Sequence, residues 1–589
     1  MKTEWNLGLL YKNDKDPQIE KDIVAAEKAY TAFEKKYKKK DFTATAKSLR
    51  TALEEQQILA DLNAQKAWWY HALRTDLNSD DSVAGAAATR IEQRLSNASN
   101  KITFFSLTIA AIPVSKQKMF LKDPLLAPFR YKLEKVFKHA KYNLTEKEEQ
   151  LADLLSQTSY GMWVDGQQRV LTQQTVSHKG EEIPLSKALS ITSDLPKAQR
   201  QKLYNATLDV LEKNSPFAEA EINAVYNYKK IMDERRGYKT PYSETVLGYE
   251  NDEKEIEALV GVVTNYFTLS QRFYSLHAKL LGEKKLGMAD RGVKIGAINK
   301  KFDFASSVKT VRDAFAVADQ KYADILDRFL ENGQIDVYPK KGKRSGAYCW
   351  GMGKSPTVVL LNHTDDIRSV ETLAHEMGHA IHTESIKYLP PRYRGYSTAT
   401  AEVASTFFEQ IVTDHLEKTL TEDEKIVLLH TKLMGDISTI FRQVACFNFE
   451  LELHNRIRTE GQVNRGDIAT LMQKHLKTYT GKSMEVSKND GYFYVTWSHI
   501  RRFFYVYSYA YGQIISRALY EKWKADPSYI TKVDQFLKAG RTMSPKDIFK
   551  SIGINTNEAF FEAGLKGIEA DIDKLEKLSK NWLKKQKKG

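Results

Sequence analysis

Apolar residues recur at every third or fourth position through most of the chain, which is the pattern of amphipathic helices. Clear examples are DPQIEKDIVAAEKAYTAFEKKY (16–37) and IEQRLSNASNKITFFSLTIAAI (91–112). Proline (14 residues) and glycine (30 residues) are scarce in a chain of 589. Since these residues mark turns, the segments between breaks should be long. The sequence therefore predicts a mainly α protein.

One stretch departs from the helical pattern. GKRSGAYCWGMGKSPTVVLLN (342–362) is rich in glycine and then β-branched, which predicts one small β-sheet that ends in the strand TVVLLN (357–362). This strand is a candidate to pair with an extended peptide by adding it to the sheet. An ordinary buried strand is the alternative. Helical spacing resumes after residue 362.

The formal charge of +14 raises the possibility of a nucleic-acid partner. The basic runs KKYKKK (35–40), KKGKR (340–344) and KNWLKKQKKG (580–589) lie far apart, however, and no nucleic-acid-binding motif accompanies them. We interpret these runs as solvated helix faces and a tail. The expectation is a protein with no nucleic-acid partner.

The sequence shows neither a membrane-spanning segment nor a signal peptide. The most apolar segment, residues 102–114, is too short to span a bilayer, and the first sixteen residues lack the apolar core of a signal peptide. Cys349 and Cys446 form no CxxC pair and cannot build a disulfide framework. These features predict a cytoplasmic protein without a membrane anchor.

The candidate chemistry lies in TLAHEMGHAIHTE (372–384), which holds three of the 13 histidines. His375 and His379 are one helical turn apart on one face, so both imidazoles can bind one metal ion. Glu376 lies about 100° further around the helix, where its carboxylate can reach a water without occupying a coordination position. This is the HExxH pattern of zinc peptidases. His382 lies one turn further on and is expected to pack beside the site, because His375, His379 and one carboxylate already complete a ligand set.

A third ligand is expected in the second predicted helix, STATAEVASTFFEQIVTDHL (397–416). Glu402 lies in its first turns beside Ala401 and Ala404, which are small enough for the two helices to approach closely. Two histidines and one glutamate leave a fourth position open to water, as in catalytic zinc sites. Glu409 lies on the same face and is an alternative ligand or a partner that orients a ligand.

HEMGHAIH followed by TATAEVAS resembles the M3 family of zinc oligopeptidases, and chain length favours its oligoendopeptidase F group. That group also shares a tyrosine-rich segment, represented here by NDGYFYVTWSHIRRFFYVYSYAYG (489–512). By the family's spacing, His499, Tyr505 and Tyr509 are the candidates to bind the substrate and to stabilise the oxyanion. Tyr505 and Tyr509 are also four residues apart, so one helical face could present both phenols. Gly512 aligns where some relatives have a third tyrosine. The identity of the phenol that meets the oxyanion stays open.

The resemblance implies a two-lobed helical metallopeptidase with an N-terminal helical domain (1–195) and a catalytic domain (196–589). It implies one Zn²⁺ per chain, held by His375, His379 and Glu402, with Glu376 as general base. The substrates would be short unstructured peptides that enter a channel between the lobes and are cut at internal bonds. The chain would act as a monomer or a weak homo-oligomer.

Two alternatives remain at this point. Another helical HExxH enzyme, such as a carboxypeptidase or dipeptidase, would share the metal site but would cut at peptide ends. A basic helical binding protein with an accidental motif would bind no zinc. Tyr507 also has a simpler interpretation than catalysis, because an aromatic residue at helical spacing is typical of a packed core.

Overall fold

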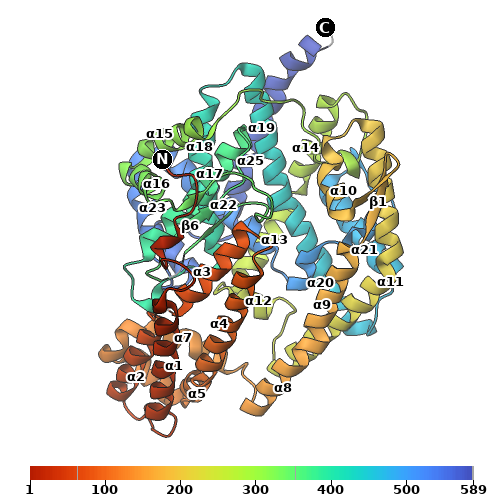
Figure 1. Cartoon of the computed structure of the whole chain (residues 1–589). Coiled ribbons are helices and arrows are strands. Elements are labelled where there is room, and N and C mark those ends of the chain that lie inside the picture. Colours follow the sequence, from red (N-terminus) through yellow and green to blue (C-terminus); the bar gives the residue numbers. More distant parts are fainter. Residues whose placement is uncertain (63, 352, 587–589) are drawn as a thin grey trace.

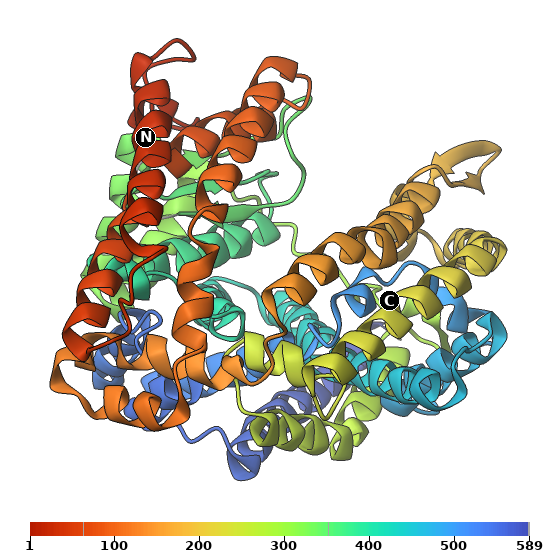
Figure 2. The ribbon, with the colours of Figure 1, turned by 90° about the horizontal axis from the view of Figure 1, so that it is seen from below.

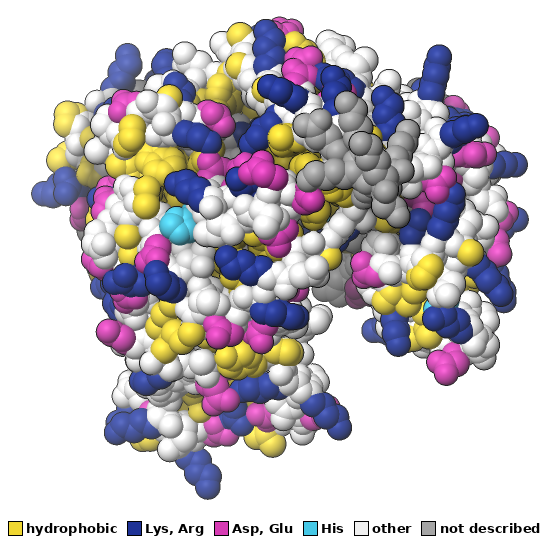
Figure 3. All heavy atoms as spheres, turned by 90° about the horizontal axis from the view of Figure 1, so that it is seen from above, with side chains coloured by type: hydrophobic (Ala, Val, Ile, Leu, Met, Phe, Trp, Pro, Cys, Tyr) yellow, Lys and Arg dark blue, Asp and Glu magenta, His cyan; other side chains and the backbone are white. Residues whose placement is uncertain are grey.

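The computed structural model of the chain describes residues 1–62, 64–351 and 353–586, and it confirms the mainly α architecture. Residues 17–140 form one helical arm, and residues 146–236 with later helices form a second arm opposite it (Figures 1 and 2). Seen from above, the surface is deeply notched between the two arms (Figure 3). On this face, Lys and Arg side chains are interspersed with Asp and Glu.

The helices fall into three groups. The first arm contains α1 (Pro17–Tyr37), α2 (Ala46–Leu59), α3 (Ala64–Leu77), α4 (Ser82–Asn100), α5 (Thr103–Ala110), α6 (Val114–Lys122) and α7 (Arg130–Ala140). The second arm contains α8 (Glu146–Ser156), α9 (Met162–Thr172), α10 (Leu185–Ile191), α11 (Lys197–Arg236), α14 (Phe267–Leu280), α20 (Arg442–Glu460) and α21 (Arg465–Thr480). The base contains α12 (Ser243–Gly248), α13 (Glu253–Asn265), α15 (Phe304–Ala318), α16 (Gln320–Asn332), α17 (Ile367–Ile386), α18 (Thr398–Glu417), α19 (Glu422–Asp436), α22 (Tyr507–Ala525), α23 (Ile530–Leu537), α24 (Pro545–Ser551) and α25 (Glu558–Gln586).

The predicted sheet is present and has three strands. They are β4 (Ile335–Asp336), β5 (Tyr348–Trp350) and β6 (Val358–Leu360). The strand predicted from TVVLLN is β6, which is buried and pairs with β4 on one side and β5 on the other. Because both edges of β6 are occupied, it cannot pair with a peptide, and the buried-strand interpretation is the correct one. The two edge strands of this sheet are β4 and β5.

Two further sheets of two strands each were not predicted. The strands β1 (Thr175–His178) and β2 (Glu181–Pro184) form an antiparallel hairpin, and β3 (Leu286–Gly287) pairs in parallel with β7 (Met484–Glu485). Each strand of the hairpin buries a single side chain. The strands β3 and β7 have two residues each, which is too short for a periodic signal.

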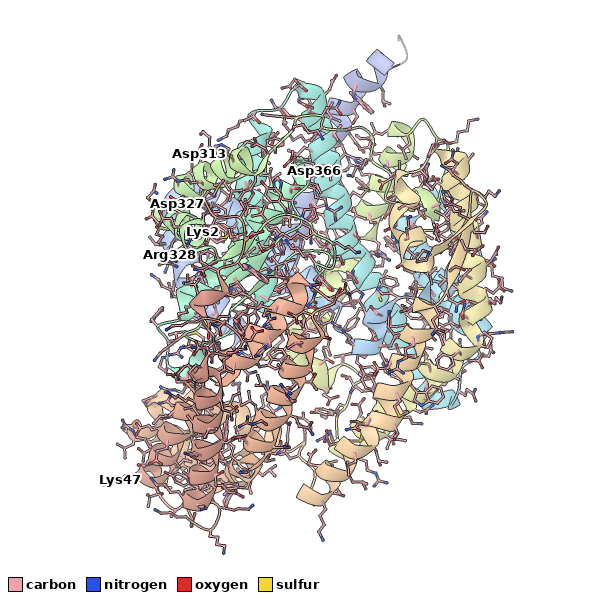
Figure 4. The ribbon with its side chains drawn as sticks, viewed as in Figure 1. Lys2, Lys47, Asp313, Asp327, Arg328 and Asp366 are labelled. Atoms are coloured by element: carbon pink, nitrogen blue, oxygen red, sulfur yellow. The ribbon has the colours of Figure 1, made fainter. Side chains whose placement is uncertain are left out.

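The N-terminal segment binds the sheet and the base directly. The Trp5 indole N–H donates to the Val359 carbonyl of β6 at 2.8 Å. The backbone N–H of Lys2, labelled in Figure 4, donates to the Leu330 carbonyl of α16 at 3.0 Å. The first residues of the chain therefore pack against elements that lie more than 300 positions later. A domain division at residue 195 stays a prediction.

The helices were compared with the requirements for crossing a membrane. Within the ranges that the structure describes, no helix combines the length and the apolar character that a bilayer span requires.

Candidate metal centre and active site

Local capping and burial fix the orientation of α17. The carboxylate of Asp366, labelled in Figure 4, accepts a hydrogen bond from the Ser369 backbone N–H at 2.8 Å and caps the helix. One face of the helix enters the core through Val370, Leu373, Met377 and Ile381, all fully buried. The adjacent face carries His375 and His379, which are both partly exposed. The predicted i and i+4 arrangement is therefore present.

The helix α18 lies unusually close to α17, and a glycine makes this possible. A Cβ atom at Gly378 would lie 2.6 Å from the Ser405 Cα and 3.1 Å from the Ala404 carbonyl oxygen. No side chain larger than hydrogen fits there without separating the helices. The close approach predicted from small residues is present, and it places Glu402 opposite the two histidines.

The three predicted ligands come together. Glu402 Oε2 lies 3.4 Å from His375 Nε2 and 3.7 Å from His379 Nε2. One donor atom from each residue falls within 4.8 Å of the others. Zinc bonds of about 2.0–2.1 Å place tetrahedral donors about 3.3 Å apart, so this separation fits a shared ion. Among the described residues, no fourth His, Cys, Asp or Glu joins the group.

Neighbouring side chains orient the ligands. His375 Nδ1 lies 2.9 Å from Glu409 Oε2, which leaves Nε2 of that ring free to face Glu402. Burial lowers the pKa of His375, but the carboxylates of Glu402 and Glu409 outweigh this and raise it to about 10. The Ser405 hydroxyl donates to Glu402 Oε2 at 3.2 Å. Glu409 therefore lies where a ligand-orienting partner is expected.

Glu376 is positioned for proton transfer. It is 7% exposed, and its Oε2 atom is buried without a hydrogen-bond partner. Burial raises the pKa of this carboxyl to about 7, a value suited to taking up and releasing a proton near neutral pH. A buried carboxylate oxygen without a partner also needs a polar ligand or water beside it. This supports the view that the site is built around bound groups.

The donor group faces two connected cavities. One, of about 590 Å³, is lined by Gly346 and Ala347 beside β5, and by His375 and Glu376. The second, of about 430 Å³, is lined by His375, Glu402 and Tyr509. Glu371, His375 and Glu409 line both. The site therefore lies in a cleft that extends to both sides of the donors.

The tyrosine-rich segment reaches this cleft through a strained corner. Phe503 and Phe504 both have positive φ angles, of 42° and 61°, which bulky residues rarely adopt. The Phe504 backbone N–H donates to the buried Glu450 carboxylate at 2.7 Å, and the Thr245 hydroxyl donates to the Phe503 carbonyl at 2.7 Å. These buried bonds hold the corner. Because α22 begins only after it, at Tyr507, the expectation of one helical face for two tyrosines is wrong.

The structure nevertheless brings the predicted aromatic residues together. The ring of Tyr505 lies 5.3 Å from that of Tyr509 and stacks at 5.9 Å on His499. The hydroxyl of Tyr509 lies 3.1 Å from His499 Nε2, and the Trp497 indole N–H donates to His499 Nδ1 at 3.2 Å. Of the two tyrosines, only Tyr509 lines the cavity that contains Glu402.

Gly512 is explained by packing rather than by chemistry. A Cβ atom there would lie 3.3 Å from the Glu402 Cβ, so α22 uses this glycine to lie against α18. A larger residue at this position would require Glu402 to shift by a few tenths of an ångström.

His382 and Tyr507 have packing roles. The ring of His382 is buried and stacks on Tyr396 at 4.1 Å. Tyr507 is fully buried, and its hydroxyl donates to the Asn251 side chain at 3.1 Å. Both simpler interpretations agree with the structure.

Sequence reasoning missed Glu371, which lines both cavities. Burial, and then the charge of Glu409, raise the pKa of Glu371 to about 8. It lies one helical turn before His375, so its spacing of four residues could have predicted that it shares the metal-binding face of the helix.

A mainly helical chain with an HExxH helix, a glutamate from the next helix and a cleft on both sides defines the class of helical metallopeptidases. Comparison with known proteins specifies the family. The sequence model of peptidase family M3 matches residues 195–566, and that of oligopeptidase F matches residues 109–168. More than half of the chain is matched, so this chain belongs to peptidase family M3. It is a metallo-oligopeptidase, as the motifs predicted.

Similar proteins agree over nearly the full length. The chain is 26% identical to an oligoendopeptidase F homolog of Borreliella burgdorferi over 595 residues, 98% of each chain. It is also 26% identical to oligopeptidase PepF of Bacillus subtilis, over 87% of this chain and 78% of that protein. The predicted relationship to the oligoendopeptidase F group is thereby confirmed.

Solved structures share the fold. A protein of Chlamydophila abortus superimposes with a TM-score of 0.86 at 20% identity, over 98% of each chain. Oligoendopeptidase-F of Enterococcus faecium superimposes with a TM-score of 0.71 at 18% identity, over 96% of this chain and 99% of that one. The arrangement of two helical arms around a base is therefore common to this fold.

Proposed function

We propose that this chain is a zinc-dependent endopeptidase that cuts internal bonds of short, unstructured peptides. The observation that carries the proposal is the convergence of His375, His379 and Glu402 in a cleft that is open on both sides of them. An enzyme that cuts only at chain ends needs one side closed. A cleft with space on both sides accommodates a chain that continues past the cut.

We assign the metal site to one Zn²⁺ held by His375, His379 and Glu402. The nitrogen, nitrogen and oxygen donors suit zinc, and the separations given above match its tetrahedral geometry. When bound there, the ion supplies Lewis-acid activation of the carbonyl and of a water molecule. Glu409 fixes the tautomer of His375 and so keeps Nε2 available.

The chain's own residues carry the proton transfers. Glu376 takes a proton from the attacking water and then gives it to the amine that leaves. Its buried position and its pKa of about 7 support this role. Tyr509 donates a hydrogen bond to the carbonyl oxygen as it acquires negative charge. His499 holds the Tyr509 hydroxyl, and Tyr505 packs against His499.

The substrate backbone is expected to pair with β5 rather than β6. The strand β5 bonds to β6 along one edge only, and the adjacent Gly346 and Ala347 line the cavity beside Glu376. An extended peptide could therefore add to this free edge. Pairing would orient the scissile bond without any side-chain contact.

We also propose a cytoplasmic setting and a monomeric or weakly associated state. Both cysteines, Cys349 and Cys446, are free, which suits a reducing compartment.

The test is cleavage of an internally quenched peptide that is blocked at both ends. We expect cleavage that a chelator abolishes and added zinc restores. The Glu376→Gln variant should retain its metal but lose turnover. Glu384→Gln, on the same helix but lining neither cavity, is the matched control and should remain active. Cleavage of unblocked peptides alone would instead identify a carboxypeptidase or dipeptidase.

A further inference from the structure

A third cavity, next to His499, contains two arginine side chains. It measures about 420 Å³, and its lining includes Arg291, Arg442, Trp497 and His499. The Arg442 guanidinium lies over the Trp497 ring at 4.3 Å, and its Nε atom is buried without a hydrogen-bond partner. Among the described residues, no carboxylate contributes to the electrostatic environment of either guanidinium, and the partner of Arg291 is the Tyr479 phenol.

Two carboxylates of this region, Asp290 and Asp490, already bind other groups. Asp290, adjacent in sequence to Arg291, binds Arg200 at 2.8 Å through Oδ1 and accepts a backbone N–H through Oδ2 at 2.9 Å. Asp490 accepts from the Tyr204 hydroxyl at 2.7 Å and from Ser487. Neither is free to neutralise the two guanidinium groups.

Two cations beside one cavity, with no carboxylate to neutralise them, are unfavourable for the protein alone. Burial and the charge of Arg291 lower the pKa of Arg442 to about 10. Burial also lowers the pKa of Arg291, but the phenols of Tyr479, Tyr274 and Tyr204 outweigh this and raise it, so the uncompensated charge is mainly that of Arg442. A buried charge without a partner is expensive, and a second like charge adds repulsion. An anion in the cavity would relieve both costs, and a guanidinium binds a carboxylate through two parallel hydrogen bonds.

This cavity lies next to the active site, to which two contacts link it. His499 lines it, and His499 Nε2 lies 3.1 Å from the hydroxyl of Tyr509, which lines the metal cavity. A second connection is the π-helical segment Ile437–Phe441. Thr439 within it lines the metal cavity, and Arg442 immediately after it lines the arginine cavity. The arginine cavity and the metal cavity therefore lie on either side of the same residues, within reach of one bound peptide.

We propose that the cavity is a carboxylate-binding subsite of the cleft, in which Arg291 and Arg442 bind a carboxylate of the peptide substrate. The carboxylate is either the C-terminal one or an Asp or Glu side chain. The inference rests on the proposed peptidase function and adds a determinant of specificity. The aromatic wall formed by Phe493 and Trp497 would pack against the apolar part of the same residue.

The experiment compares matched peptides that differ only in charge. In the first pair, one peptide has a free C-terminal carboxylate and the other has a C-terminal amide. In the second set, all peptides have a C-terminal amide, and each pair carries Asp or Asn at one position of the sequence. We expect kcat/KM to be at least about tenfold higher for the carboxylate member of one pair, mostly through KM. Arg442→Gln and Arg291→Gln should each reduce this preference, because cleavage of the carboxylate peptide falls more than cleavage of the neutral peptide. The pair that discriminates identifies the source of the carboxylate.

Arg235→Gln is the control, because Arg235 is exposed in the last turn of α11 and lines none of these cavities. It should leave the preference unchanged. Equal cleavage of all charged and neutral pairs would overturn the proposal, as would an unchanged preference in folded Arg442→Gln and Arg291→Gln proteins.

Calorimetric binding of the same peptides to Glu376→Gln separates the subsite from catalysis. Tighter binding of the carboxylate peptide, lost in Glu376→Gln/Arg442→Gln, supports the subsite even if the wild type cuts nothing. Equal binding of both peptides overturns it even if the wild type is an active peptidase.

Discussion

The replacement Gly378→Ala tests whether helix packing sets the geometry of the metal site. The new methyl carbon would lie 2.6 Å from the Ser405 Cα, whereas ordinary carbon contacts are about 3.5–4.0 Å. The two helices must therefore separate locally by about 1 Å. Overpacking costs about 1–3 kcal/mol, and the better helix propensity of alanine returns about 1 kcal/mol. The net loss of stability should be at most about 2 kcal/mol.

The effect on the metal site should be larger than the effect on folding. A shift of about 1 Å would increase the 3.4 Å separation of Glu402 Oε2 and His375 Nε2 beyond what one zinc ion can bridge. Zinc affinity should fall by about tenfold to a hundredfold, and kcat/KM by about a hundredfold. Competition with a chromophoric chelator measures the affinity, and thermal unfolding measures the stability.

Gly261→Ala is the matched control for helix propensity. It lies on α13, and a Cβ atom there would meet nothing within 4 Å. It should gain up to about 1 kcal/mol of stability and bind zinc as the wild type does. If folded Gly378→Ala protein also bound zinc with wild-type affinity, the reasoning that α17 and α18 set the ligand separation would be refuted.

Three further changes have defined outcomes. Glu409→Ala removes the partner of His375 Nδ1, so zinc affinity measured by chelator competition should fall about tenfold to a hundredfold; an unchanged affinity would contradict the orienting role. Tyr509→Phe should lower kcat by about a hundredfold with little change in KM, whereas an effect confined to KM would assign Tyr509 to binding. Burial lowers the pKa of His430 to about 3, so below about pH 6.5 the unfolded chain binds a proton that the folded chain does not. Stability should therefore fall by about 2 kcal/mol between pH 6.5 and 5, and His430→Gln should flatten this dependence; equal pH slopes would refute it.

The metal-binding helix could be predicted from the sequence because its information is local. The spacing of His375 and His379, the cap before residue 367 and the apolar face of the helix all lie within one continuous segment. The position of Glu402 followed from small residues that permit close helix packing. The role of Gly378 in the same contact was not predicted, because a glycine inside a helix gives no indication of its neighbour.

The remaining features depend on contacts between distant segments. The central place of β6 in its sheet depends on β4, which has two residues and no detectable period. The corner at Phe503 and Phe504 depends on a hydrogen bond that the Phe504 backbone N–H donates to Glu450, more than fifty residues earlier. The spacing of Tyr505 and Tyr509 could not show that this corner delays the start of the helix to Tyr507. Arg291 and Arg442 lie on separate elements, and only the fold places them at one cavity.

The most direct test of the metal site is anomalous diffraction at the zinc absorption edge from crystals of the untreated protein. The account predicts one peak per chain, bonded to one ring nitrogen each of His375 and His379 and to a Glu402 oxygen, with a non-protein ligand completing the coordination. A peak that excludes Glu402, or a fourth protein donor in the open position, would contradict the proposed hydrolytic site.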